Sequence, residues 1–161
     1  MAGKVTQQQI RWCAQECERQ QSGEMSVYDL FIALESAQEL YQSHSTRIIT
    51  MDHVREIGYR VEPKKNRPYR YFRETPVLIN GHPAGVSPDN IEHAVYQLLG
   101  SQTDLTADEF YQEFEDIHPF IDGNGRVGAI FWNWRASILH HPSSPPEYMA
   151  RGTQETVPAS I

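Results

Sequence analysis

Long apolar runs are missing from this sequence. No stretch approaches the roughly 20 consecutive apolar residues that a helix needs to cross a bilayer. Residues 1–7 are polar and lack the apolar core of a secretory signal peptide. Hydrophobic residues make up 39% and charged residues 22% of the 161 positions, an ordinary composition for one globular domain. We expect a soluble, cytoplasmic protein with no membrane partner.

Positive charge is also scarce. The chain has 14 Lys and Arg against 21 Asp and Glu, which gives a formal net charge of −7 and a pI of about 5.4. Because nucleic acids are polyanions, this balance argues against a nucleic-acid partner. The run 64–70 is basic, and we interpret it as a solvated loop.

Cysteine is nearly absent. Cys13 and Cys17 are the only two, and their spacing of four places them on one helix face, where a disulfide is poorly accommodated. No neighbouring His or Cys completes a zinc site. The sequence therefore predicts two buried thiols, which stay reduced in a cytosol.

Helical periodicity is abundant. Residues that can cap a helix N-terminus precede each apolar stripe. The expected caps are Thr6, Ser26, Thr50, Ser87 and Thr106, and the expected helices run over about 7–19, 26–41, 51–58, 88–99, 107–117 and 126–138. His53 falls on the polar face of the third helix, and we expect its side chain to be solvated.

One short segment reads as β-structure. Val77, Leu78 and Ile79 form an apolar run, and Asn80-Gly81 is a strong hairpin-turn signal. The return arm, 82–86, is short and contains a proline, so it can form only an edge strand. The predicted fold class is all-α, mainly a helical bundle, with one small β-hairpin. A single domain should span 1–141, followed by a polar, proline-containing tail over 142–161.

The residue types best suited to catalysis and phosphate binding are concentrated in one run, His118-Pro119-Phe120-Ile121-Asp122-Gly123-Asn124-Gly125-Arg126. This run places a glycine-rich loop at the start of an apolar helix, where exposed N–H groups and the positive end of the dipole make an anion site. Arg126 adds a cation suited to phosphate. Asp122 is a hard oxygen ligand for Mg²⁺, and His118 is suited to act as a general base. The pattern indicates metal-assisted phosphoryl or nucleotidyl transfer.

The same nine residues resemble the signature of the Fic (Fido, Fic/Doc) family, H-P-F-x-[D/E]-G-N-G-R-x-x-R. The family also has a β-hairpin flap upstream of the motif, to which the stretch 69–86 is similar. By pattern the resemblance covers 69–139, and it implies the Fido fold.

The resemblance implies a protein adenylyltransferase, which moves AMP from ATP to a Ser, Thr or Tyr hydroxyl of a target protein. His118 would be the base, and Asp122 would hold Mg²⁺. The phosphates would be bound by Gly123, Asn124, Gly125 and Arg126, and Phe120 would anchor the loop. The flap residues Val77, Leu78, Ile79, Asn80 and Gly81 would bind the target segment by strand addition. A separate antitoxin is a further implied partner, which would make the chain a toxin-like regulator.

The chain departs from the family pattern at two places. Ala129 stands where the final motif arginine, implied to hold the γ-phosphate of ATP, is expected. The inhibitory pattern [S/T]-x-x-x-E-[G/N] has only an imperfect counterpart over 143–148. Three alternatives therefore stay open: AMP transfer, transfer of another phosphate-containing group as in Doc-type kinases, and a non-catalytic Fido-fold binding module.

Overall fold

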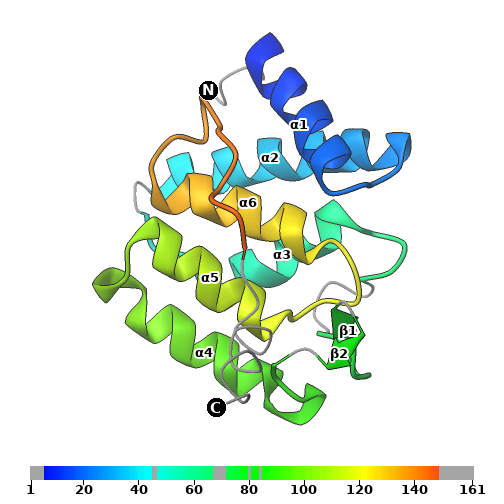
Figure 1. The fold of residues 1–161 in the computed structure, drawn as a ribbon. Helices are drawn as coiled ribbons and strands as arrows, with labels where there is room; N and C mark the ends of the chain where they lie inside the picture. The colour runs from blue at the N-terminus through cyan, green and yellow to red at the C-terminus, as the bar shows by residue number, and fades with distance from the viewer. Residues whose placement is uncertain (1–5, 45–46, 67–71, 80, 84, 149–161) are drawn as a thin grey trace, which may run out of the picture.

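The computed structural model describes residues 6–44, 47–66, 72–79, 81–83 and 85–148. These residues form a mainly helical fold (Figure 1), as the sequence predicts. The α-helices are α1 (Gln7–Arg19), α2 (Glu24–His44), α3 (Met51–Val61), α4 (Ile91–Ser101), α5 (Ala107–Ile117) and α6 (Asn124–Arg135). Two 3₁₀ turns, η1 (Pro88–Asn90) and η2 (Gln102–Asp104), flank α4.

Three helices begin at the threonines that the sequence marks as caps. The side chains of Thr6, Thr50 and Thr106 each accept a hydrogen bond from the backbone N–H of the residue three positions on. The side chain of that residue in turn accepts a hydrogen bond from the backbone N–H of the threonine. Such reciprocal capping boxes satisfy two donors that a helix start leaves free.

The expected cap at Ser26 is wrong. The Ser26 N–H donates to the Gly23 carbonyl at 2.9 Å, so the helix begins at Glu24 and Ser26 lies inside its first turn. Glu24 places a carboxylate near the positive end of the helix dipole, which favours this earlier start. Ser87 makes no capping bond either, because Pro88 begins the 3₁₀ turn η1 before α4.

Two expectations about α3 are also corrected. The helix passes through Gly58 and ends at Val61, because Gly58 provides room for the Phe120 ring and does not terminate the helix. His53 is only 6% exposed. Its Nδ1 accepts from the Thr50 N–H at 3.1 Å, and its ring lies 5.0 Å from the Trp134 ring, so it is a core residue.

Helix α6 ends three residues earlier than expected. Ser137 has φ 63°, its N–H donates to the Trp134 carbonyl, and the Ile138 N–H donates to the Asn133 carbonyl. This pair of bonds is a Schellman closure with serine at the left-handed position.

The hairpin is very short. Strands β1 (Leu78–Ile79) and β2 (His82–Pro83) pair antiparallel, with Leu78 opposite Pro83. Gly81 has φ 82°, a conformation that glycine adopts without steric cost. Asn80 lies outside the described residues. The predicted flap is therefore represented by two paired residues on each side.

Helix α6 lies at the centre of the fold. Figure 1 shows it between α5 and the α1–α2 pair, with α3 behind it. Its side chains are buried around most of its circumference, as expected of a helix inside a core. Five fully buried aromatic residues, two of them on α6, belong to the same core cluster: Phe110, Phe114, Phe120, Phe131 and Trp134.

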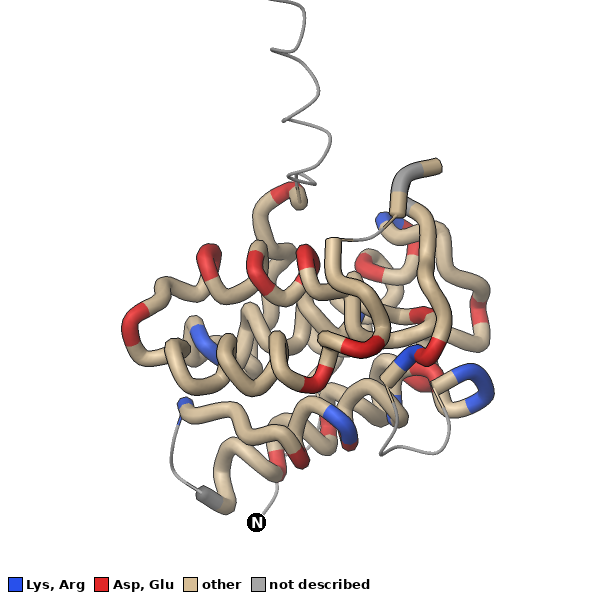
Figure 2. The backbone as a smooth tube through the Cα atoms, turned by 90° about the horizontal axis from the view of Figure 1, so that it is seen from below, with Lys and Arg blue, Asp and Glu red and all other residues tan. Residues whose placement is uncertain are grey.

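The prediction of two buried thiols is confirmed. Cys13 and Cys17 are buried and free, and burial raises the pKa of the Cys13 thiol to about 12. No helix among the described residues has the length and apolarity to span a bilayer. In Figure 2, acidic residues are spread along many elements, and the Lys and Arg positions that it colours are scattered.

Gly58 and Gly100, both within helices, offer a matched stability test. A Cβ at position 58 would overlap the Phe120 ring, whereas position 100 has open space. Gly58→Ala should cost about 1–3 kcal/mol of unfolding free energy through overpacking, and Gly100→Ala should gain about 0.5–1 kcal/mol. Urea denaturation measures both. Equal stabilities for the two variants would contradict the packing role of Gly58.

Candidate active site

The candidate site is the loop between α5 and α6. His118 follows the last residue of α5 and adopts the left-handed conformation, with φ 52° and ψ 63°. Its N–H still donates to the Phe114 carbonyl. A non-glycine residue in this region carries a modest steric cost, so the surrounding contacts must hold His118 in place.

Asn124 braces the loop from within. Its amide oxygen accepts from the Phe120 N–H, and its amide nitrogen donates to the Phe120 carbonyl, both at 2.8 Å. Phe120 is 1% exposed and packs on Gly58 and on Phe72, whose ring centroid lies 5.5 Å away. The predicted anchoring by Phe120 fits this geometry. Asn124 has both polar side-chain atoms engaged in the brace, so its predicted contact with phosphate stays a prediction.

The first turn of α6 has no side-chain cap. Gly123 stands at the cap position with φ 79° and offers no side-chain acceptor. The N–H groups of the first helical turn lack intrahelical partners by geometry, and the dipole makes this end positive. Gln20, at the end of α1, contacts Gly125, where a Cβ would overlap its side-chain oxygen. The loop thus has the elements of an anion site, beside the C-terminal end of α1.

Asp122 is an ionised, accessible carboxylate. Its Oδ1 accepts from the Gly123 N–H and its Oδ2 from Lys65 Nζ, both at 2.8 Å, and its side chain is 42% exposed. Partial burial would raise the pKa of Asp122, but the bonds from Lys65 and Gly123 outweigh it and lower the pKa below its ordinary value. No cluster of three or more potential metal-binding side chains occurs among the described residues. One carboxylate suits Mg²⁺ when substrate phosphates and water supply the other ligands.

Arg126 is buried beneath the loop. Its side chain is 4% exposed, and Nη2 lies 3.4 Å from Glu62 Oε2 and 3.8 Å from Asp122 Oδ1. Nη1 is 3.5 Å from the Val61 carbonyl. These long contacts hold the guanidinium between the end of α3 and the loop, close to Asp122, and the predicted contact of Arg126 with phosphate stays a prediction.

The His118 ring is largely buried and uncharged at neutral pH. Burial, together with the positive charge of Arg73, lowers the pKa of His118 to about 4, while Asp122 opposes the shift. Its Nδ1 is buried without a hydrogen-bond partner in the structure. A neutral imidazole can accept a proton, as a general base must.

Sequence reasoning missed a second set of residues around the loop. Asn66 donates to the Asp122 carbonyl at 2.7 Å and to the Gly58 carbonyl at 3.0 Å. Lys65 and Glu62, from the same segment, contact Asp122 and Arg126. Lys65 and Asn66 fall in the run that is expected to be a solvated loop, but Asn66 is only 4% exposed. No local pattern could have revealed the contacts with Asp122 and Arg126, which span 56 or more positions of the chain.

Arg73 connects the predicted flap to the motif loop by hydrogen bonds to both segments. This side chain donates to the carbonyl of Val86, after the hairpin, and to that of His118, both at 2.6 Å. Within the predicted flap, Leu78 is 66% exposed, Gly81 is exposed and Val77 is half-buried. The structure describes the backbone of Ile79 but not its side chain.

The Fic/DOC family model matches residues 36–136 of this chain. The chain belongs to the Fic/DOC family. The match runs from the middle of α2 to the end of α6 and includes the hairpin and the whole loop. Members of this family are generally transferases that act on protein targets. No curated protein matches the chain.

Ala129 lies one turn into α6 of this Fic domain and is fully buried. The Asn133 amide donates to the Ala129 carbonyl and to the Ser143 carbonyl, at 2.8 and 3.0 Å. The stretch 143–148, which resembles the inhibitory pattern imperfectly, forms no helix. Tyr148 at its end donates to Asp116 Oδ1 at 2.8 Å. Ala129 is therefore enclosed by the core at the position where the family motif has an arginine.

Glu115 is a buried acid that the motif did not reveal. It lies on α5, is 5% exposed, and its Oε1 contacts α6 at Gly128, where a Cβ would overlap it. Burial raises the pKa of Glu115 to about 8; Arg19 opposes the shift and Asp116 adds to it. The side chain is therefore mostly protonated at pH 7, and its Oε1 has no partner in the structure.

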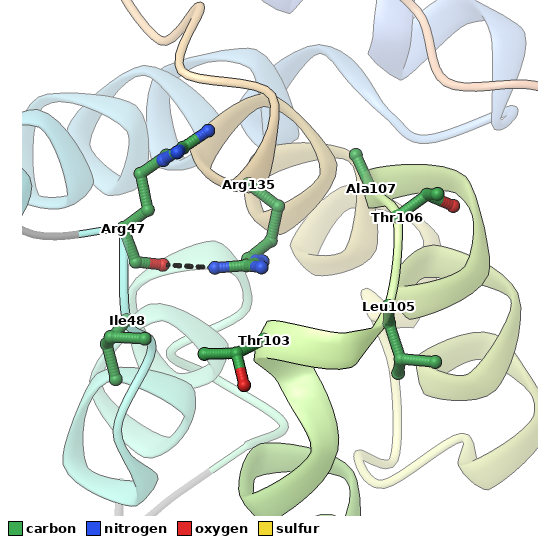
Figure 3. Close-up of a pocket in the computed structure, with 7 residues that line it drawn as sticks. All are labelled: Arg47, Ile48, Thr103, Leu105, Thr106, Ala107 and Arg135. Carbon is green, nitrogen blue, oxygen red and sulfur yellow. Dashed lines mark hydrogen bonds between the residues drawn. The ribbon is translucent and has the colours of Figure 1, made fainter.

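A cavity of about 500 Å³ lies elsewhere, at the opposite end of the α5–α6 pair (Figure 3). It is lined by Arg47, Ile48, Thr103, Leu105, Thr106, Ala107 and Arg135. Arg135 Nη1 donates to the Arg47 carbonyl at 3.0 Å. Because α5 has 11 residues and rises about 1.5 Å per residue, this cavity is separated from the motif by the length of that helix.

Position 129 can be tested by restoring the expected arginine. Ala129→Arg should lower the free energy of unfolding by about 3 kcal/mol or more, since an unpaired guanidinium would enter a closed core. Ala14→Arg, at an exposed position of α1, controls for the same change and should stay within about 0.5 kcal/mol of wild type. Thermal melts compare them. If both variants melt alike, position 129 has room for a cation.

The raised pKa of Glu115 implies that the stability of the protein depends on pH. Its folded-state pKa of about 8 exceeds the ordinary glutamate pKa of 4.5, so in this pH range the unfolded chain releases a proton that the folded chain keeps. This contribution to stability is full below about pH 4.5 and is lost as pH rises through 8. Glu115→Gln should therefore gain stability relative to wild type between pH 5 and 8. Denaturation series test this, with Glu18→Gln on the exposed face of α1 as control; a constant difference across pH would contradict it.

Proposed function

We propose that this chain transfers AMP, or a related phosphate-containing group, from a nucleotide to a Ser, Thr or Tyr hydroxyl of a target protein. The observation that carries the proposal is the pairing of a neutral His118 with an ionised Asp122 on one loop that leads into the uncapped start of α6. Transfer chemistry needs a base, charge neutralisation and positioning, and one short loop supplies all three.

In the proposed reaction His118 takes the proton of the target hydroxyl. The hydroxyl oxygen bonds to the α-phosphorus of the donor, and the bond from that phosphorus to the β-phosphate bridging oxygen breaks. With ATP as donor, pyrophosphate leaves with that electron pair and AMP stays on the target. The N–H groups at the start of α6 and the guanidinium of Arg126 would stabilise the charge that develops on the transferred phosphate.

Asp122 is the residue that would hold Mg²⁺. Its carboxylate fits a hard cation, because it is ionised and 42% exposed. Lys65 now bonds to its Oδ2, but the Lys65 side chain is 59% exposed and can leave that oxygen. The bound ion would neutralise phosphate charge on the donor.

The target would bind along the hairpin. Leu78, at 66% exposed, and Ile121 of the motif loop, at 51% exposed, are large apolar side chains near the site that remain open to solvent. A target segment that pairs with the hairpin edge would bring its hydroxyl toward His118. A separate antitoxin protein and a cytoplasmic location are further parts of this proposal.

Ala129 favours a second candidate, a Fic domain that binds a nucleotide or partner without transfer. No cation stands at this buried position, so ATP would lose the γ-phosphate contact that the family motif implies.

The same loss leaves transfer possible from another donor. A donor without a γ-phosphate, such as CDP-choline, does not need that contact.

The test uses labelled ATP, GTP, UTP and CDP-choline with a lysate and Mg²⁺. Wild type should label a protein band, and His118→Asn should reduce the rate by about 10²- to 10⁴-fold, the usual contribution of a general base. Asparagine tolerates the left-handed conformation of position 118, so its fold should persist, as a thermal melt can check. If no donor labels a target above this control while a nucleotide still raises the melting temperature, the binding-module candidate replaces the transferase.

A further inference from the structure

Arg73 is a buried cation whose bonds all run to main-chain carbonyls. It is 2% exposed and forms no ion pair with a carboxylate among the described residues. Its guanidinium donates to the carbonyls of His118 (2.6 Å), Val86 (2.6 Å), Thr75 (3.1 Å) and Ile117 (3.3 Å). An unpaired charge is costly to bury, so this arrangement requires a compensating role.

The four carbonyls belong to two parts of the site. Ile117 and His118 end α5, where the last carbonyls lack intrahelical partners and the dipole favours a cation. Thr75 and Val86 lie before and after the hairpin. The backbone adds a further bond, from the Arg73 N–H to the Pro119 carbonyl at 2.9 Å. One residue thus joins the base of the hairpin to the backbone on both sides of His118.

Among the described residues, Nδ1 of the His118 ring has no hydrogen-bond partner that could orient it. A catalytic histidine is commonly oriented by a hydrogen bond at its second nitrogen, but Nδ1 of His118 is buried without one. Its backbone is also in the uncommon left-handed region. The bonds of Arg73 to the His118 carbonyl and to Pro119 therefore supply the constraint that a ring partner would otherwise give.

We propose that Arg73 is a positioning residue for His118, which holds the base through its backbone and places the hairpin at a set position relative to it. This inference rests on the proposed transfer function for its kinetic consequence. Its structural consequence, the state of the His118 ring, does not depend on that function.

Charge provides a second measurable consequence. The charged groups that act on the His118 ring are Arg73, before the hairpin, and Asp122, in the motif loop; Arg73 lowers the pKa of the ring and Asp122 raises it. The titration therefore reports how close the Arg73 charge lies to the ring, and the shape of the ring signal and kcat separate positioning from simple support.

The experiment compares Arg73→Met, which removes charge and bonds, with Arg73→Lys, which keeps the charge but loses the planar fork of donors. Arg60→Met, in an exposed ion pair with Glu56 on α3, controls for the loss of one arginine. NMR follows the His118 ring across pH in the protein without nucleotide. In Arg73→Met the pKa should rise from about 4 toward 6.5. In Arg73→Lys it should stay low, but the single ring signal should broaden or split.

Turnover gives the kinetic part of the test. Both Arg73 variants should lower kcat by about 10- to 100-fold, as expected when a catalytic group is misplaced by about 1 Å, with the KM for the donor nearly unchanged. If Arg73→Met does not fold, Arg73→Lys carries the test through its ring signal and kcat. A folded Arg73 variant with wild-type kcat and a wild-type His118 signal overturns the proposal. If wild type transfers nothing, the proposed function fails, and the shape of the His118 ring signal in Arg73→Lys alone decides the role of Arg73.

Discussion

The site depends on the packing of Phe120 against Gly58. This contact places the motif loop on α3, because the ring occupies the space that a side chain at position 58 would fill. Asn124 then closes the loop by bonding both backbone groups of Phe120, and α6 begins where that brace ends. The position of the uncapped helix start, and of Asp122 beside it, follows from this one apolar contact.

Opposite environments give the two ionisable residues of the loop opposite states. Burial and Arg73 keep His118 neutral, whereas Lys65 and the Gly123 N–H keep Asp122 ionised. Sites in which neighbouring groups are driven to different protonation states are typical of acid–base chemistry. Here the separation depends on two cations, Arg73 and Lys65, from a single connection between α3 and β1.

The predictions that succeeded depend on short separations along the chain. The capping boxes at Thr6, Thr50 and Thr106 each join residues three apart, and the glycine-rich loop joins two consecutive helices. Some wrong predictions, the cap at Ser26 and the end of α6, are shifts of two or three residues at a helix end. Others concern residues whose role comes from a distant partner. His53 looked solvated but packs on Trp134, and Gly58 looked like a helix end but accommodates Phe120.

The sequence alone determined the helical class and the Fic motif, and it supplied the proposed roles of His118, Asp122 and Arg126, since these follow from residue type and local spacing. Only the tertiary structure decided which residues support them. Arg73 reaches His118 across 45 positions and Lys65 reaches Asp122 across 57. The sequence likewise shows that Ala129 replaces the motif arginine, but only the structure shows that this position is buried. Such contacts arise when helices pack, because packing brings together side chains whose separation along the chain carries no periodic signal.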